Sequence, residues 1–183
     1  MRAEPLKLEG VYLITPKRFD DPRGSFFEVW NRKTLHTSGI NVGMVVQENQ
    51  SHSKAGVLRG LHYQIQYPQG KLVRVLSGAI LDVAVDLRRS SPTFSQWLSH
   101  TLTADSREQL WIPAGFAHGF RVLGDSAEIL YSCTDYYCPE QDRTLLWNDP
   151  DIAIDWQLTE GEEVLLSDKD QAGHLLRDAE TYP

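Results

Sequence analysis

Residues 71–86 read KLVRVLSGAILDVAVD, and this stretch decides the fold class. Its second half, residues 79–86, alternates with a period of two, which is typical of a half-buried strand. One face carries Leu81, Val83 and Val85, and the other carries Asp82, Ala84 and Asp86. The first half, KLVRVL, is a second β-rich run, so Ser77-Gly78 between the two runs predicts a tight hairpin turn.

Similar short β-rich runs extend outward on both sides of this stretch, with Gly, Pro, Asn and Ser between them. Helical periodicity is almost absent from 25 to 134, and Gly124-Asp125 suggests another turn. The pattern predicts an all-β protein, an antiparallel double sheet of the jelly-roll type. The nine expected strands are 26–30, 44–49, 57–64, 71–76, 79–86, 97–102, 108–113, 118–123 and 127–134.

The last part of the chain, from about 140 to 183, is acidic and is interrupted by Asn148-Asp149-Pro150. Ser167 followed by Asp170 resembles a helix capping box, and Leu175, Leu176 and Ala179 would form an apolar stripe. We expect one domain over residues 1–183, with a short helical tail that packs over the barrel.

Composition excludes several classes of protein. The chain has 183 residues, with 18 Lys and Arg against 25 Asp and Glu, and its formal net charge of -7 opposes binding to nucleic acid or to an anionic membrane surface. No apolar run approaches the roughly 20 residues that span a bilayer, and no signal peptide is visible. Cys133 and Cys138 form neither a disulfide framework nor a metal-type spacing. We therefore expect a cytoplasmic protein.

The segment 57–64, VLRGLHYQ, places two ionisable side chains in a strand that otherwise looks buried. Regular alternation puts Arg59 and His62 on opposite faces, so either they serve different surfaces or Gly60 marks a bulge that re-aims one of them. A second segment, 111–120, sets His118 among small residues after a Pro-Ala-Gly turn, where a ligand or another backbone segment approaches closely. Each histidine has the alternative interpretation of a packed rim residue.

Other candidate residues also have structural alternatives. Tyr131 alternates with Ile129 and Cys133 and is either functional or a packing residue. Tyr136 and Tyr137 lie in a loop before Pro139, where an exposed aromatic ring can stack on a planar base. Asp170 has the alternative of being only the N3 residue of a capped helix, and Arg23 that of being a simple turn residue.

Two histidines in a jelly roll raise the possibility of a metal site, since metal-binding cupins have a similar layout. In those proteins the first motif supplies a His-x-His pair and a carboxylate. Here the pair is His62-x-Gln64, and Lys71 begins the next strand where the carboxylate is expected. An ammonium repels a cation and an amide oxygen is a weak partner for imidazole-type metals, so we expect no metal here.

Taken together, these motifs make the chain resemble the dTDP-4-dehydrorhamnose 3,5-epimerase family of the cupins over about Leu6 to Leu176. The segments that carry the resemblance are DPRGSFFE (21–28), QENQSHS (47–53), VLRGLHYQ (57–64), QGKLVRVLSG (69–78), DVAVDLRRSSPTF (82–94), QLWIPAGFAHGF (109–120), YSCTDYYCPE (131–140), LLWNDP (145–150) and LSDKD (166–170). The resemblance implies a homodimeric cupin jelly roll without metal or other cofactor. It would invert C3 and C5 of dTDP-4-keto-6-deoxy-D-glucose to give dTDP-4-keto-L-rhamnose, in dTDP-L-rhamnose synthesis for cell-surface polysaccharide.

The resemblance also implies roles for individual residues. His62 would be the general base, Asp170 its orienting carboxylate, Tyr131 the general acid and Lys71 the stabiliser of the enolate oxygen. The substrate-binding residues that it implies are Arg23, Glu28, Gln47, Glu48, Asn49, Arg59, His118, Tyr137, Asp142 and Lys169. Among these, Tyr137 would stack on thymine, and Arg23 and Glu28 would reach the site of a neighbouring subunit. Relatives commonly carry Glu where this chain has Asp142.

Three alternatives compete with this interpretation. A relative that epimerises only C3 or only C5, or a keto-sugar isomerase, would share the scaffold and the base. A non-catalytic sugar-binding jelly roll is opposed by the joint presence of His62, Asp170, Lys71 and Tyr131. A metal-dependent cupin oxygenase is opposed by Gln64 and Lys71.

Overall fold

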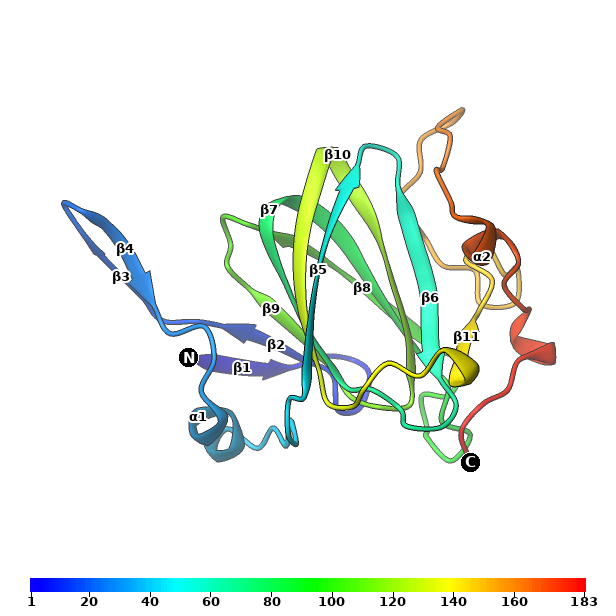
Figure 1. Cartoon of the computed structure of the whole chain (residues 1–183), viewed down its shortest axis with the longest axis horizontal. Helices are drawn as coiled ribbons and strands as arrows, with labels where there is room; N and C mark the ends of the chain where they lie inside the picture. The colour runs from blue at the N-terminus through cyan, green and yellow to red at the C-terminus, as the bar shows by residue number, and fades with distance from the viewer.

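A computed structural model describes all 183 residues of the chain, which is built mainly from β-strands (Figure 1). The strands are β1 (Arg2–Pro5), β2 (Tyr12–Thr15), β3 (Arg18–Asp21), β4 (Gly24–Phe27), β5 (Gln47–Lys54), β6 (Leu58–Gln64), β7 (Lys71–Asp86), β8 (Trp97–Thr103), β9 (Gln109–Ile112), β10 (Phe116–Cys133) and β11 (Asp142–Thr144). The helices are α1 (Arg32–Thr37) and α2 (Asp168–Gln171), with 3-10 turns η1 (Pro139–Gln141) and η2 (Leu176–Asp178). None of the helices is long and apolar enough to cross a membrane.

The long strands β7 and β10 organise the sheet, because they pair with each other along most of their lengths. The first half of β7 also pairs with β9 and its second half with β8. The first half of β10 pairs with β6 and its second half with β5. The two strands therefore run through two layers, one with β1, β2, β9 and β5 and one with β8, β6 and β11. This is the predicted antiparallel jelly roll, and the sheets do not close.

The two predicted turns at Ser77-Gly78 and Gly124-Asp125 are wrong as hairpins. Both lie inside continuous strands, at the corner where β7 and β10 pass together from one layer to the other. The φ of Gly78 is +76°, and a Cβ at this position would meet the Ser126 carbonyl oxygen at 2.0 Å. A positive φ serves a corner as well as a hairpin, so the local sequence does not distinguish the two.

The second half of β7 is buried on both faces, whereas the sequence predicted burial on one. Ala84 faces the apolar core between the layers, together with Leu98 and Phe120. Leu81 and Val85 face a second core, which residues of the C-terminal tail cover. The tail residues in this second core include Leu145, Ile152 and Trp156. The layer that contains β8, β6 and β11, here called the outer layer, is therefore buried between the inner core and the C-terminal tail. The tail also contains α2.

The N-terminal region contains elements that the sequence did not predict. Strands β1, β2 and β3 precede the first expected strand, and Asn31 caps the six-residue helix α1 by accepting from the Thr34 N–H. Strands β3 and β4 pair only with each other and form an arm that projects from the body of the molecule (Figure 1). Phe26 is 71% exposed on this arm, which is unusual for a large apolar side chain.

Candidate active site

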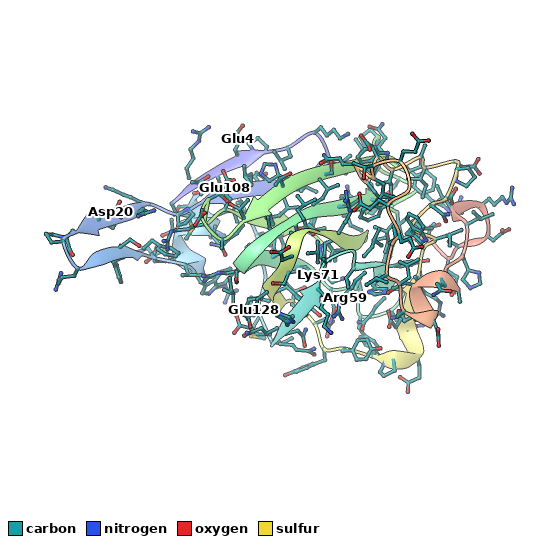
Figure 2. All side chains as sticks on the ribbon, turned by 90° about the horizontal axis from the view of Figure 1, so that it is seen from above. Glu4, Asp20, Arg59, Lys71, Glu108 and Glu128 are labelled. Carbon is teal, nitrogen blue, oxygen red and sulfur yellow. The ribbon has the colours of Figure 1, made fainter.

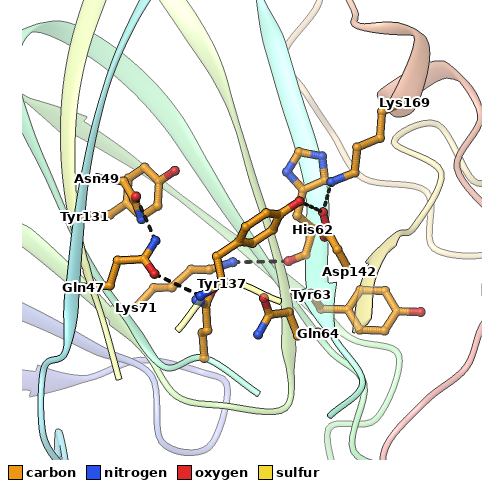
Figure 3. A pocket seen from close by; sticks show the side chains of 11 residues that line it. Gln47, Asn49, His62, Tyr63, Gln64, Lys71, Tyr131, Tyr137, Asp142 and Lys169 are labelled. Atoms are coloured by element: carbon orange, nitrogen blue, oxygen red, sulfur yellow. Dashed lines mark hydrogen bonds and ion pairs between the residues drawn. The ribbon is translucent and has the colours of Figure 1, made fainter. Parts of the chain in front are cut away.

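The chemistry-bearing side chains of β5, β6, β7 and β10 converge on a cavity of about 280 Å³ and an adjoining one of about 170 Å³. His62, Lys71 and Tyr131 line both. The larger cavity is also lined by Gln47, Asn49, Tyr63, Gln64, Gln69, Tyr137, Asp142 and Lys169. The smaller is also lined by Ser51, Arg59, His118, Gly119 and Phe120. Figure 3 shows His62 and Tyr131 on opposite sides of the larger cavity, with Lys71 between them.

Because of a bulge in β6, the Arg59 and His62 side chains line the same cavity. His118 of β10 pairs with His62, and Phe120 pairs with Arg59, so β6 contains one residue more than its partner strand. The φ of Gly60 is +117°, and a Cβ there would lie 2.5 Å from the Gly119 Cα. Only glycine fits this approach, so of the two alternatives left open by the sequence the bulge is correct.

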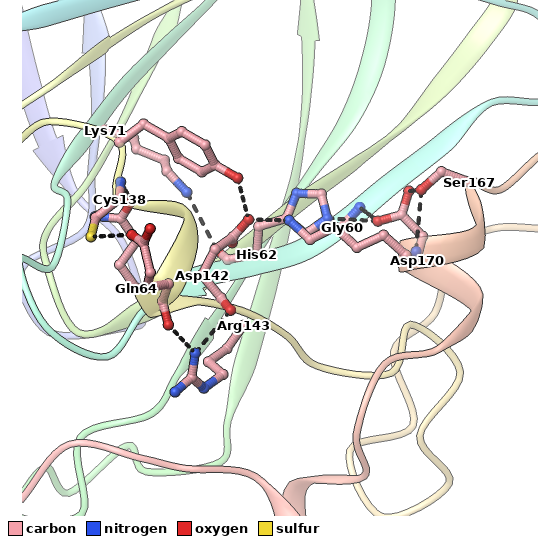
Figure 4. Close-up of polar contacts among 12 residues, drawn as sticks. Gly60, His62, Gln64, Lys71, Cys138, Asp142, Arg143, Ser167 and Asp170 are labelled. Atoms are coloured by element: carbon pink, nitrogen blue, oxygen red, sulfur yellow. Dashed lines mark hydrogen bonds and ion pairs between the residues drawn. The ribbon is translucent and has the colours of Figure 1, made fainter.

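His62 is held by a carboxylate from the C-terminal tail. Its Nε2 lies 2.6 Å from Asp170 Oδ1, and the two residues are 108 positions apart in the chain. Asp170 Oδ1 also accepts from the Gly60 N–H, which the bulge exposes, at 3.2 Å, and Oδ2 accepts from Ser167 Oγ at 2.7 Å (Figure 4). With the Nε2 proton directed at Asp170, Nδ1 is the ring nitrogen left to act as an acceptor.

Asp170 satisfies both of the interpretations that the sequence offered. Ser167 is the N-cap of α2 and accepts from the Asp170 N–H, so Asp170 is the N3 residue of a capping box. Its carboxylate, only 4% exposed, is also the partner of His62. The short helix therefore fixes the backbone of Asp170 and aims its side chain at β6.

The pKa values of this pair shift in the directions that a base requires. Burial lowers the pKa of His62, and Lys169 and Lys71 add to the effect, while the hydrogen bond to Asp170 opposes it. Burial acts to raise the pKa of Asp170, but the hydrogen bonds from His62 and Ser167 outweigh it and the pKa is lowered. At neutral pH the imidazole is neutral and the carboxylate is charged.

Lys71 and Tyr131 face the same space with few partners of their own. The Lys71 ammonium is buried, and its one hydrogen bond goes to the His62 carbonyl oxygen at 3.3 Å. Burial lowers the pKa of Lys71, with nearby Cys133 opposing the shift. Burial raises the pKa of Tyr131, with Cys133 adding to the shift, so its phenol is protonated at neutral pH. The Tyr131 hydroxyl has no hydrogen-bond partner in the chain and is free for a ligand.

A second histidine–aspartate pair lies in the adjoining cavity. His118 Nε2 lies 2.6 Å from Asp82 Oδ1, with the carboxylate supplied by the neighbouring strand β7. Asp82 is fully buried, and its Oδ2 has no hydrogen-bond partner.

The far end of the larger cavity is polar and carries several of the expected substrate-binding residues. Asp142 Oδ2 forms an ion pair with Lys169 and accepts from the Tyr137 hydroxyl at 2.9 Å (Figure 3). Gln47 Oε1 accepts from the Tyr137 N–H at 2.9 Å, and Gln47 Nε2 donates to Asn49 at 3.0 Å. At the other end, Arg59 Nε donates to Ser53 Oγ at 3.0 Å.

Three expected substrate contacts are not brought into this cavity. Glu48 alternates with Gln47 and Asn49 on β5, so it faces outward and accepts from Ser132 Oγ. Arg23 pairs with Asp21 on the arm, where its side chain is 90% exposed, and Glu28 accepts from Asn31 just beyond the arm. Figure 2 shows Asp20 of the arm far from Lys71 and Arg59. Glu48 therefore lies outside this cavity in its own chain, because the period of two turns it away, and its role in binding stays a prediction.

The donor set at the position of a cupin metal does not fit a metal. The side-chain amide of Gln64 is fully used by three backbone groups, from Tyr67, Tyr136 and Cys138. The neighbouring cation is the Lys71 ammonium. A metal ion here would meet a positive charge, and from Gln64 only an amide oxygen that already accepts from the Cys138 N–H.

Sequence reasoning missed several residues that shape the site. Asp82 was assigned only to a face of its strand, although an aspartate in an apolar strand already signals a buried partner. Gln69 and Tyr63 also line the cavity, without a sequence signal that sets them apart. The role of the Gly60 N–H as a donor to Asp170 depends on the bulge.

Comparison with known proteins shows the family of the chain. Residues 5–178 match the family model described as dTDP-4-dehydrorhamnose 3,5-epimerase. The chain is 50% identical over 183 residues to the dTDP-4-dehydrorhamnose 3,5-epimerase of Pseudomonas aeruginosa, covering 100% of both chains.

The chain is also similar in fold and sequence to two solved structures. The first is the dTDP-6-deoxy-D-glucose-3,5-epimerase of Legionella pneumophila in complex with dTDP-4-keto-L-rhamnose. It is 47% identical, with a TM-score of 0.92 over 98% of this chain and 94% of that one. The second, a 3'-monoepimerase of Streptomyces bikiniensis in complex with dTDP-quinovose, is 33% identical with a TM-score of 0.85, over 94% and 87% of the two chains. The chain described here belongs to the dTDP-4-dehydrorhamnose 3,5-epimerase family.

Proposed function

We propose that this protein inverts C3 and C5 of dTDP-4-keto-6-deoxy-D-glucose to give dTDP-4-keto-L-rhamnose, as its family membership indicates. The placement of a neutral base and a protonated acid on opposite sides of a buried ammonium supports this most directly (Figure 3). An inversion needs a proton removed from one face of the carbon and a proton delivered to the other.

The chemistry follows from the position of the C4 carbonyl. The protons at C3 and C5 are both α to it, so removal of either gives an enolate. His62, oriented by Asp170, removes the proton through its free ring nitrogen. The Lys71 ammonium, with one hydrogen bond in the chain, stabilises the enolate oxygen. Tyr131 then protonates the carbon from the opposite face, and no redox change takes place at any step.

The remaining cavity residues fit the rest of a nucleotide sugar. Arg59 and Lys169 bring positive charge to a chain with a net charge of -7, as a diphosphate requires. We place Gln47, Asn49 and His118 around the sugar and diphosphate. Tyr137, 54% exposed, stacks on the thymine, with Asp142 beside it.

We further propose that the protein is a homodimer. Arg23 and Glu28 lie outside the cavity of their own chain, and the arm buries neither Phe19 nor Phe26. Burial of this arm against a second copy would cover the exposed rings and bring Arg23 to the partner's site.

Both cysteines are free thiols, which is consistent with the expected cytoplasmic location.

The oligomeric state is tested by sedimentation. A species of twice the 20.8 kDa chain mass is expected at assay concentration. Replacing Phe26 with Ser should shift the population toward the monomer and lower the activity. A fully active species with the mass of one chain would contradict the dimer and the shared site.

The reaction is tested by solvent deuterium incorporation into dTDP-4-keto-6-deoxy-D-glucose, followed by NMR at C3 and C5. We expect incorporation at both carbons and inversion at both. The similarity to a 3'-monoepimerase favours epimerisation at C3 alone as the second candidate, which predicts incorporation at C3 only. Absence of exchange at both carbons would contradict either activity.

A further inference from the structure

Gln64, the last residue of β6, joins two loops that lie far apart in the sequence. Its side chain is 3% exposed, and every polar atom in it is used by the backbone. Nε2 donates to the carbonyl oxygens of Tyr67 at 2.8 Å and Tyr136 at 3.2 Å, and Oε1 accepts from the Cys138 N–H at 2.7 Å. One buried amide therefore fixes the loop after β6 and the loop after β10.

Tyr137 lies between the two residues of the second loop that Gln64 holds. Its own N–H donates to Gln47 Oε1 at 2.9 Å. Three consecutive residues of an exposed loop thus have their backbone held by side-chain amides from the cavity floor. Tyr137 as a whole residue remains 54% exposed, so its backbone is fixed while the residue stays accessible to a ligand.

The backbone of Gln64, at the end of β6, is also held in place, which fixes the position of its side-chain amide. The Gln64 carbonyl oxygen accepts from the Tyr182 hydroxyl at 2.5 Å, and the rings of Tyr182 and Tyr63 meet edge to face at 6.2 Å. Only a side chain with one acceptor and two donors at this reach satisfies all three backbone groups. The hydrogen bonds therefore require glutamine in particular.

We propose that Gln64 is a positioning residue for the base of the nucleotide, acting through Tyr137. By fixing the backbone of residues 136–138 before the ligand arrives, it removes much of the ordering cost of stacking a base on the Tyr137 ring. All its polar atoms are used by the backbone, so it contributes through loop order. This inference rests on the proposed function, in which Tyr137 stacks on thymine.

The test measures dTDP binding by calorimetry in Gln64→Met, which keeps the length of the side chain and removes all three hydrogen bonds. We expect the Kd for dTDP to rise about tenfold. Inorganic diphosphate lacks the base, so its inhibition constant should differ by less than about twofold between wild type and Gln64→Met. KM for the nucleotide sugar should rise with the Kd, and kcat should stay within about threefold. The matched control is Gln66→Met, since Gln66 is exposed and makes no side-chain hydrogen bond.

A double-mutant cycle with Tyr137→Ala shows whether Gln64 acts through the ring. In the Tyr137→Ala background, Gln64→Met should weaken dTDP binding less than twofold further. Fully additive losses, or an equal loss of diphosphate inhibition, would overturn the inference. If Gln64→Met fails to fold, Gln64→Glu replaces it, since it keeps an acceptor for Cys138 and loses both donors, and the same weakening is expected.

The stacking role of Tyr137 and the positioning role of Gln64 can be contradicted separately. Unchanged dTDP binding in Tyr137→Ala would contradict the stacking role within the proposed function. Weakened binding in Tyr137→Ala together with unchanged binding in Gln64→Met would contradict the Gln64 inference alone.

Discussion

The two histidine–aspartate pairs of this protein have the same contact distance and different surroundings. His62 and Asp170 join strand β6 to the C-terminal tail, and the His62 side chain is 32% exposed. His118 and Asp82 join two neighbouring strands, and the His118 side chain is 9% exposed. In both pairs Nε2 and a carboxylate oxygen lie 2.6 Å apart.

The element that supplies the carboxylate determines whether the paired imidazole faces the cavity or is buried in the sheet. Asp170 comes from a separate layer and satisfies both its oxygens, so it orients an imidazole that opens onto the cavity. Asp82 lies within the sheet, where its second oxygen is left without a partner. A fully oriented and accessible imidazole suits proton abstraction, whereas a buried one suits a fixed contact to the ligand.

The largest expected effect separates the two histidines directly. His62→Asn removes the base and should lower deuterium incorporation at both C3 and C5 by about 10³-fold, within the usual range for general-base loss. His118→Asn should retain an exchange rate at least tenfold above that of His62→Asn. His174→Asn is the control, because this histidine is exposed on the tail. Near wild-type exchange in His62→Asn would remove the distinction between the pairs.

Tyr131→Phe tests the acid that faces the first pair. The change keeps the ring and removes a hydroxyl with no partner in the chain, so thermal stability should hardly change. Net formation of the epimerised product should fall by about 10²-fold or more. Deuterium exchange at one carbon should persist better, since the enolate can regain a proton on the face it lost. Full epimerisation by this variant would mean that water or another group is the acid.

A smaller effect concerns the pH dependence that Asp170 controls. The pKa of His62 is lowered by burial, so kcat/KM should rise with pH along a limb centred below 6.5, the ordinary value for histidine. Asp170→Asn removes a group that raises this pKa, so the limb should move to still lower pH while the plateau falls by about tenfold. Asp168→Asn, exposed in the same helix, should leave the profile unchanged. An unchanged pH dependence of kcat/KM in Asp170→Asn would show that Asp170 neither orients His62 nor affects its pKa.

The same shifts have a consequence for stability. Because both pKa values are lowered in the folded state, the unfolded chain binds more protons between the folded and unfolded values. The contribution of His62 to stability is thus present above its unfolded pKa and is lost as the pH falls through its folded pKa. Chemical denaturation of wild type against Asp170→Asn over the acid range measures the part that depends on the pair.

The smallest expected effect is that of metal removal. The Gln64 amide oxygen is a weak metal ligand that already accepts from the Cys138 N–H, and Lys71 supplies a positive charge. Treatment with EDTA should therefore change kcat/KM by less than about twofold. Loss of activity that a divalent ion restores would contradict this and would revive the metal-dependent alternative.

Several features followed from the sequence alone because local rules were sufficient. The period of two from Leu81 to Val85 indicated a strand, and the spacing of Ser167 and Asp170 indicated a capped helix. The motifs around His62, Tyr131 and Asp170 indicated the family. These signals depend on residues close together in the chain, where backbone geometry fixes which side chains share a face.

What the sequence did not determine depends on contacts between distant segments. Gly60 permits a bulge, but only its approach to Gly119 creates one and turns His62 to the same face as Arg59. Gly78 permits a positive φ, and only pairing with β10 makes the position a corner instead of a hairpin. The pairing of His62 with Asp170 spans 108 residues, so packing of the tail against the outer layer decided it. Burial and hydrogen bonding between elements select among the conformations that local sequence allows, because an unpaired buried polar group is too costly to leave.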